Sequence, residues 1–226
     1  FNQVTAEIDA CLEAAVRLKA PFVRLHTVID KETYSEEAVK QVLSYALPKA
    51  EESKIILLIE TMGAYADTQL LRDLLDSYAS DYLAALWDMH ETHLLQGESS
   101  QTSITNLGAY IRHVHIKDSL KNDDGSVSYQ LIGEGNMPIP DMIRALGSIN
   151  YDGFISLEWK PEWMEDLQDR EIIFPHFVNY MSRFNNPRKR KKSLYYNHDG
   201  TGQYVWKKDD LIDLTFPQVL DRMVEE

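Results

Sequence analysis

The chain has 226 residues and a formal net charge of −13 at pH 7, and 44% of its residues are hydrophobic. This length allows one sizeable hydrophobic core plus an appendage. The acidic balance argues against a nucleic-acid-binding surface, because phosphate contacts need clustered Lys and Arg. No apolar run approaches the roughly 20 residues of a membrane helix, and no signal peptide is visible. We therefore expect a globular protein with no nucleic-acid or membrane partner.

The chain has a single cysteine, Cys11. One cysteine excludes an intramolecular disulfide framework and fits a reducing compartment, so we expect a cytoplasmic protein. Cys11 falls on the apolar stripe of a predicted helix, and we interpret it as a packing residue rather than a nucleophile. The chain starts with Phe1 rather than Met and stops at Glu226 inside a helical pattern, so we interpret it as a segment of a longer gene product.

Apolar runs alternate with amphipathic helical patterns along the first 160 residues. The predicted elements, in chain order, are a helix over 5–19, a strand over 22–26, a helix that Ser35 caps and Pro48 kinks, a strand over 55–60, a helix near 67–79, a strand over 82–88, a helix near 102–109, a strand over 111–117, a hairpin within 119–135, a helix over 138–148 and a strand over 153–158. Apolar strands between amphipathic helices indicate a parallel sheet buried on both faces.

Five such strands fit two architectures. We predict an α/β fold, a (β/α)8 TIM barrel truncated at its N-terminus to about five strand–helix units of roughly 30 residues each. The alternative is an open, doubly wound sheet of five strands. We prefer the barrel because a polar side chain recurs at the same position, the end of the strand, in four consecutive strands.

Those side chains are Glu60, Asp88, His115 and Glu158, and each lies at the end of a short apolar run. The first three are separated by about one strand–helix unit of the barrel. The interval between His115 and Glu158 is longer because it contains the predicted hairpin. Barrel chemistry collects at the C-terminal ends of the strands. Three carboxylates and one imidazole that converge there predict a site for one divalent cation.

Several short stretches resemble one family, the xylose isomerase-like TIM barrels, which include sugar phosphate isomerases and epimerases, ketose 3-epimerases and inosose dehydratase. The resemblance covers about residues 5–183 and rests on Ile-Glu at 59–60, Leu-Trp-Asp-Met-His at 86–90, His-Val-His-Ile-Lys-Asp at 113–118, Gly-Glu-Gly at 133–135 and Ile-Ser-Leu-Glu-Trp at 155–159. It implies that Glu60, Asp88, His115 and Glu158 bind one Mn²⁺, Mg²⁺ or Co²⁺, on strands five to eight of the barrel.

The resemblance also implies a reaction. A divalent ion polarises a carbonyl and a neighbouring hydroxyl, and Glu60 and Glu158 are the expected acid–base pair. Proton transfer alpha to the carbonyl, through an enediolate, would isomerise or epimerise a sugar or sugar phosphate. The small-molecule partner is therefore expected to be a sugar; a homo-oligomer is left open.

Three further residues are candidates for substrate binding. Relatives often carry a substrate-contacting His three residues after the metal-binding Asp, but this chain has Glu91 there, which we interpret as a loop residue. We expect His90 to face the substrate instead. Lys117 is expected to bind a substrate oxygen or phosphate, with an ion pair to Asp118 or a nearby carboxylate as the alternative. His26 is expected to line the pocket, and His113 to lie beneath the site.

The tail has a different character. Residues 185–193 read as a basic linker that follows a barrel domain at 1–184. Residues 194–226 resemble the opening segment of AMP-forming acyl-CoA synthetases, which implies a covalently fused AMP-dependent ligase domain. One alternative to the isomerase is a non-catalytic barrel module fused to such a ligase. Another is an enzyme like endonuclease IV, but this needs a three-zinc cluster with more His and acidic ligands than the sequence supplies, and a basic face that the chain lacks.

Overall fold

The computed structural model describes residues 1–26, 32–159 and 169–184. The chain divides into two units, Phe1–Tyr180 and Met181–Glu226, and each is described by itself. The predicted linker at 185–193 and the ligase-like segment at 194–226 lie outside the described residues. Over the described ranges, no helix combines the length and the apolar character that a membrane crossing requires.

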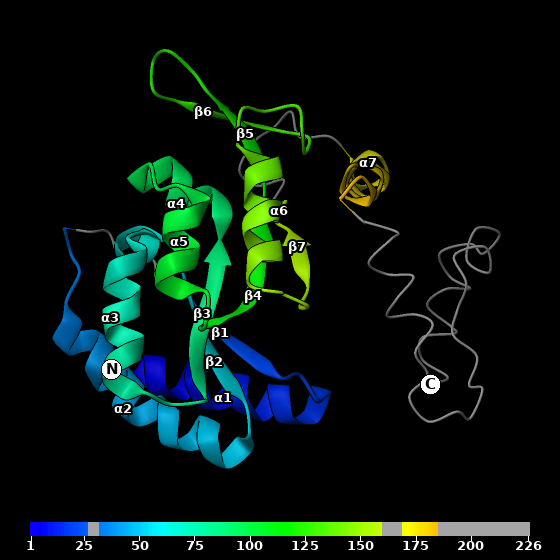
Figure 1. Ribbon diagram of the computed structural model, residues 1–226. Coiled ribbons are helices and arrows are strands. Elements are labelled where there is room, and N and C mark those ends of the chain that lie inside the picture. Colours follow the sequence, from blue (N-terminus) through cyan, green and yellow to red (C-terminus); the bar gives the residue numbers. More distant parts are fainter. Residues whose placement is uncertain (27–31, 160–168, 185–226) are drawn as a thin grey trace, which may run out of the picture. The chain divides into compact units, whose positions relative to one another are not determined.

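Strands and helices alternate along the first unit as predicted (Figure 1). The five predicted strands, the hairpin and the predicted helices are all present, whereas the short 3-10 helix η1 and the helices α4 and α7 are not among the elements given above. The elements are α1 (Asn2–Leu18), β1 (Phe22–Leu25), α2 (Glu36–Ser53), β2 (Ile56–Glu60), η1 (Gly63–Ala66), α3 (Thr68–Tyr78), β3 (Leu83–Asp88), α4 (Met89–Gln96), α5 (Ser100–Leu107), β4 (Ile111–Ile116), β5 (Asp118–Lys121), β6 (Val127–Gln130), α6 (Ile139–Ser148), β7 (Ile155–Leu157) and α7 (Arg170–Ser182).

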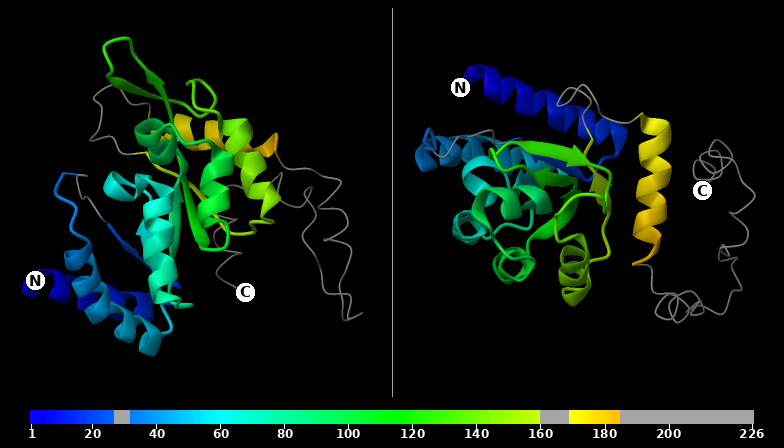
Figure 2. Two further views of the ribbon diagram at one scale, coloured as in Figure 1. Left: turned by 60° about the vertical axis from the view of Figure 1, so that its left-hand side comes forward. Right: turned by 90° about the horizontal axis from the view of Figure 1, so that it is seen from above.

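Five strands form one parallel sheet in the order β1-β2-β3-β4-β7. This order follows the chain without the reversal that a doubly wound sheet has at its switch point. The large core lies between one face of the sheet and helices α1, α2, α3, α5 and α6 (Figure 2). The other face carries a small cluster of Leu58, Ala84 and Leu86. The sheet is therefore a curled, barrel-type half, and the doubly wound alternative is excluded for the described residues.

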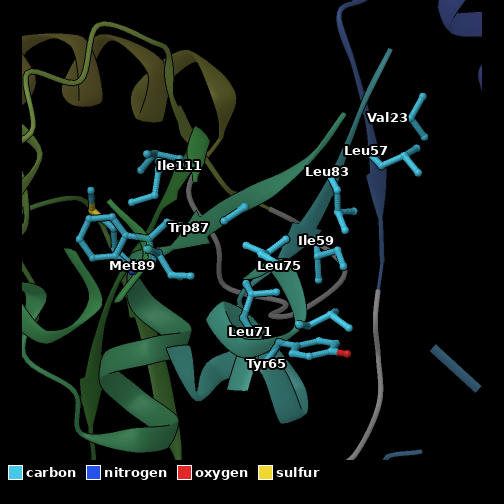
Figure 3. Packing of buried hydrophobic residues seen from close by; sticks show 14 of the residues in the cluster. Val23, Leu57, Ile59, Tyr65, Leu71, Leu75, Leu83, Trp87, Met89 and Ile111 are labelled. Carbon is cyan, nitrogen blue, oxygen red and sulfur yellow. The ribbon is translucent and has the colours of Figure 1, made fainter. Parts of the chain in front are cut away.

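Alternation along the strands decides which side chains enter the core. Leu57 and Ile59 of β2 belong to this core, where Leu57 lies near Val23 and Leu83, and Ile59 lies near Leu75 of α3 (Figure 3). Each such side chain, when fully buried, contributes about 1.5–3 kcal/mol through the hydrophobic effect. The intervening residues of β2 face the inside of the curled sheet, so Glu60 points away from this core.

An irregularity in β4 sets the phase of its histidines. Ala85 pairs with Ile111, but the next residue, Leu86, pairs with His113, so Arg112 is passed over. Asp88 consequently lies opposite His115 instead of Val114. This bulge keeps Ile111 in the core on one side and turns the histidine onto the inner face, where a bulge next to a functional site commonly re-aims a side chain.

Side chains cap several helices at their N-terminal ends. The Ser35 hydroxyl accepts a hydrogen bond from the Ala38 amide at 3.3 Å, which caps α2 as predicted. Asp67 caps α3 and Asp88 caps α4 in the same way. Pro48 lies inside α2, which continues past it to Ser53.

The predicted packing role of Cys11 is wrong. Cys11 is exposed on α1, and Val16, which shares the predicted apolar stripe, is 53% exposed. The buried residues of α1 are Ile8, Leu12 and Ala15. In the described structure α1 packs mainly against α2 and β1, which cover only a narrow strip of the helix.

Candidate functional site

The four predicted ligands lie together at the C-terminal end of the sheet. Glu60 and Asp88 are the last residues of β2 and β3, His115 lies near the end of β4, and Glu158 follows β7 directly. Glu60, His115 and Glu158 each offer one ligand atom, and these atoms lie within 4.8 Å of one another. Asp88 joins them through Lys117, whose Nζ lies 2.8 Å from Asp88 Oδ2 and 2.8 Å from Glu158 Oε2.

Glu60 is buried between a histidine and an arginine. Its Oε1 lies 2.9 Å from His115 Nδ1, and the Arg24 guanidinium donates to both carboxylate oxygens at 3.1 and 3.3 Å. Burial by itself raises the pKa of the Glu60 carboxyl, but the neighbouring His115 and Arg24 outweigh that effect and lower the pKa. Glu60 is therefore held as a carboxylate, the form that binds a cation or accepts a proton.

His115 has an unsatisfied ring nitrogen that suits a metal ion. Its Nδ1 is buried and, among the described residues, makes no hydrogen bond, because the contact with Glu60 Oε1 is not aligned as one. A buried polar atom without a partner costs about 1–3 kcal/mol. An imidazole nitrogen beside two carboxylates is a donor set that divalent first-row metals accept. The residues present thus fit the divalent ion that the sequence predicts.

Asp88 serves the helix and the site at once. Its Oδ1 caps α4 by accepting from the His90 and Glu91 amides at 2.9 and 3.1 Å, and its Oδ2 accepts from Lys117. Burial raises the pKa of Asp88, and Lys117 acts in the opposite direction. Since both oxygens accept from donors, the geometry is that of the ionised carboxylate.

Lys117 lies at the centre of an acidic cluster. Its side chain is buried, and its Nζ contacts Asp88 Oδ2, Glu158 Oε2 and Glu91 Oε1 at 2.8, 2.8 and 2.9 Å. Burial by itself lowers the pKa of the ammonium, but the three carboxylates raise it well above its ordinary value. The contacts correspond to the ion-pair alternative, and substrate binding by Lys117 stays a prediction.

Two residues of the site were not predicted. Glu91, expected to be a loop residue, lies in the first turn of α4 and reaches Lys117. Its position three residues after the capping Asp88 is that of a capping-box glutamate, the one signal that could have placed it on a helix. The alternation of side chains along β1 places Arg24 on the inner face of the sheet. Its guanidinium contacts Glu60 and lies 4.0 Å from Glu158 Oε1.

A pH measurement tests the contacts of Glu91. Burial by itself raises the pKa of the Glu91 carboxyl, but His90 and Lys117 outweigh it and lower the pKa to about 2. A carboxyl whose folded-state pKa is lowered contributes stability above its unfolded pKa near 4.5, and that contribution is lost as the pH falls toward 2. In metal-free protein, we expect the difference in unfolding free energy between wild type and Glu91→Gln to shrink from ~3 kcal/mol at pH 6 toward zero near pH 2. Urea unfolding across that range measures it, and a difference that does not change with pH would contradict it.

His90 is placed differently from the expectation. It is completely buried, its Nε2 lies 2.8 Å from the Ser119 hydroxyl, and its Nδ1 lies 3.4 Å from Glu91. The Tyr129 ring of the hairpin lies 5.7 Å from its ring. His90 thus supports the β5–β6 hairpin from behind the site, and a substrate contact stays a prediction.

His113 and His26, the other two histidines expected near the site, differ in their distance from the predicted ligands. His113 lies beneath the site as expected: it contacts the Ser156 hydroxyl at 2.9 Å, and its ring meets that of His115 edge to face at 5.5 Å. His26 is exposed and lines a cavity of about 450 Å³ between α1, β1 and α2. None of the four predicted ligands lines that cavity, so a substrate contact for His26 also stays a prediction.

Asp118 organises the loop that follows the hairpin. One oxygen accepts from the Gly133 and Gly135 amides at 2.8 and 3.1 Å, and the other accepts from the Ser119 and Met137 amides at 2.8 and 3.2 Å. This carboxylate therefore connects the His-x-Lys-Asp stretch to the Gly-Glu-Gly stretch, two of the motifs on which the resemblance rests.

Gly135 allows this close approach, which gives a stability test. A Cβ at Gly135 would lie 2.1 Å from Asp118 Oδ1 and 2.6 Å from the Ser119 carbonyl oxygen. We expect Gly135→Ala to lower the free energy of unfolding by ~1–3 kcal/mol, the usual cost of overpacking. The matched control is Gly147→Ala in α6, where a Cβ meets nothing within 4 Å and a gain of ~0.5–1 kcal/mol is expected. Equal effects of the two changes in thermal unfolding would refute this account of the loop.

A family comparison agrees with this geometry. A family model described as "Xylose isomerase-like TIM barrel" matches residues 2–173. The chain belongs to this family. Among curated proteins, fructoselysine 3-epimerase from Escherichia coli O157:H7 is 31% identical over 72 residues, which are 32% of this chain and 25% of that protein. A fructoselysine 3-epimerase from Shigella flexneri matches to the same extent. The matched part thus spans about a quarter of these curated relatives.

Solved structures of xylose isomerase-like barrels share the fold. A xylose isomerase domain protein from Planctomyces limnophilus superposes with a TM-score of 0.62 at 18% identity, over 84% of this chain and 66% of that one. A D-tagatose 3-epimerase-like protein gives a TM-score of 0.54 at 26% identity, over 66% of this chain and 59% of that one. These barrels are longer than the part that this chain matches.

Proposed function

We propose that the protein is a divalent-metal-dependent isomerase or epimerase of a sugar or sugar phosphate, which transfers a proton alpha to a carbonyl through an enediolate. Membership of the xylose isomerase-like family supports the reaction class. The fructoselysine 3-epimerases and the D-tagatose 3-epimerase-like protein among its relatives support a ketose as the substrate.

One observation carries the proposal: the buried His115 Nδ1, which makes no aligned hydrogen bond among the described residues, lies among carboxylates at the C-terminal end of a barrel sheet. The residues that would hold the ion are Glu60, Asp88, His115 and Glu158. Charge supports a divalent ion, because among the described residues four carboxylates of the cluster contact two cations, Arg24 and Lys117. On this count, an ion with two positive charges would balance the described part of the cluster.

The two glutamates would carry the proton transfer. The ion, when bound, would polarise the substrate carbonyl and the neighbouring hydroxyl. Glu60 and Glu158 come from strands at opposite sides of the cluster, so one can remove a proton and the other can return one. Arg24 lies close to both carboxylates and favours their ionised forms, which a general base requires.

A second function has one observation in its favour. Lys117 already satisfies Asp88 and Glu158 with an internal cation, which is what a barrel that binds no metal would need. A non-catalytic barrel module, fused to an AMP-forming ligase as the tail resemblance suggests, is therefore the alternative.

Proton exchange distinguishes the two functions. The purified protein with Mn²⁺, Mg²⁺ or Co²⁺ is incubated in deuterium oxide with a panel of ketoses and ketose phosphates, and NMR follows the proton alpha to each carbonyl. We expect exchange of that proton for at least one sugar, and loss of exchange with EDTA. Lack of exchange across the panel with metal-loaded protein would favour the non-catalytic barrel.

A further inference from the structure

We propose that Lys117 is a positioning residue that competes with the divalent ion for Asp88 and Glu158, and that Glu91 holds its ammonium when the ion binds. This inference rests on the proposed metal site and adds a control of metal affinity to it. It assigns a role to a buried cation of the described residues that the proton-transfer scheme does not use.

The contacts place the ammonium on ligand oxygens. Lys117 Nζ lies 2.8 Å from Asp88 Oδ2 and 2.8 Å from Glu158 Oε2. The other Asp88 oxygen is committed to capping α4, so Oδ2 is the oxygen that the side chain can offer to an ion. An ion that binds this oxygen must therefore displace the ammonium from it.

Glu91 provides the place to which the ammonium can withdraw. Its Oε1 already lies 2.9 Å from Lys117 Nζ, and its backbone is fixed in the first turn of α4. Glu91 also differs from the four predicted ligands, because it comes from a helix and not from a strand end. A lysine that keeps Glu91 as its partner stays paired while Asp88 and Glu158 turn to the ion, which avoids an unpaired buried charge.

The decisive variant removes the competitor without changing the charge. Glu91→Gln together with Lys117→Met removes one negative and one positive group, so the net charge of the cluster is that of the wild type. If Lys117 competes, this double variant binds Mn²⁺ about ten- to a hundredfold more tightly than the wild type, the range that charge-assisted hydrogen bonds are worth. Isothermal titration with MnCl₂ gives the Kd values, and the Mn²⁺-induced rise in melting temperature gives a second readout.

Three comparisons interpret that result. Glu91→Gln alone keeps the competitor and removes its alternative partner, so it is expected to bind Mn²⁺ about tenfold more weakly than the wild type. Lys49→Met, which breaks an exposed pair with Asp9 on α1, is expected to leave the Kd unchanged. If the double variant does not fold, Lys117→Gln in the Glu91→Gln background replaces it, because that side chain keeps a hydrogen-bonding group.

The outcomes separate the inference from the proposed function. A double variant that binds Mn²⁺ no more tightly than a metal-binding wild type overturns the role of Lys117 and leaves the metal site standing. Binding by the double variant but not by the wild type supports the role of Lys117. Absence of binding in every variant, the competitor-free one included, overturns both the inference and the metal-dependent function.

Discussion

Glu158→Gln is expected to slow deuterium exchange of the ketose proton by about 10²- to 10⁴-fold, the usual contribution of a positioned acid or base. The amide has the shape of the carboxylate but cannot take up the proton, and it also removes one ligand charge. The comparison is made by NMR with wild type and variant at saturating Mn²⁺, so that weaker metal binding does not mimic a lost base.

A matched control for this change is Glu52→Gln, which alters an exposed glutamate of α2 and should leave exchange unchanged. Exchange that survives Glu158→Gln at the wild-type rate would show that the acid–base assignment is wrong, although the reaction class would stand.

Lys117→Met is expected to lower the free energy of unfolding of the metal-free protein by ~3–5 kcal/mol, the cost of removing one partner from a buried ion pair. Asp88, Glu91 and Glu158 would be left as close carboxylates without their shared cation. Urea unfolding in the presence of EDTA measures the change.

Lys49→Met serves as the comparison for stability, because its pair with Asp9 is exposed and such pairs contribute ~0–1 kcal/mol. If Lys117→Met costs no more than Lys49→Met, the buried cluster does not stabilise the fold in the way described.

The strands, and the position of Glu60, Asp88, His115 and Glu158 at one end of the sheet, could be predicted because both depend on local patterns. Apolar runs between amphipathic helices identify the strands, and a polar residue at the end of each run identifies the inner end of a barrel strand. Glu60, Asp88, His115 and Glu158 repeat this pattern four times, and the structure brings them to one end of the sheet.

The remaining features depend on contacts between distant segments. Helix α4 has only eight residues and starts directly at the end of β3, so no loop or long apolar stripe marks it. The bulge at Arg112, which turns His115 toward the inner face, arises from the pairing of β4 with β3. The environment of Lys117 combines side chains from β3, α4 and the end of β7, and a single sequence contains no signal for that meeting.

Crystals of the protein soaked in MnCl₂ would test the central claim most directly, by anomalous diffraction at the manganese edge. The account predicts one strong peak per chain, about 2.0–2.3 Å from ligand atoms of Glu60, Asp88, His115 and Glu158, and no peak at this place in a His115→Ala variant. A manganese peak elsewhere, a peak that does not depend on His115, or an ammonium of Lys117 that stays between Asp88 and Glu158 at saturating Mn²⁺ would contradict it.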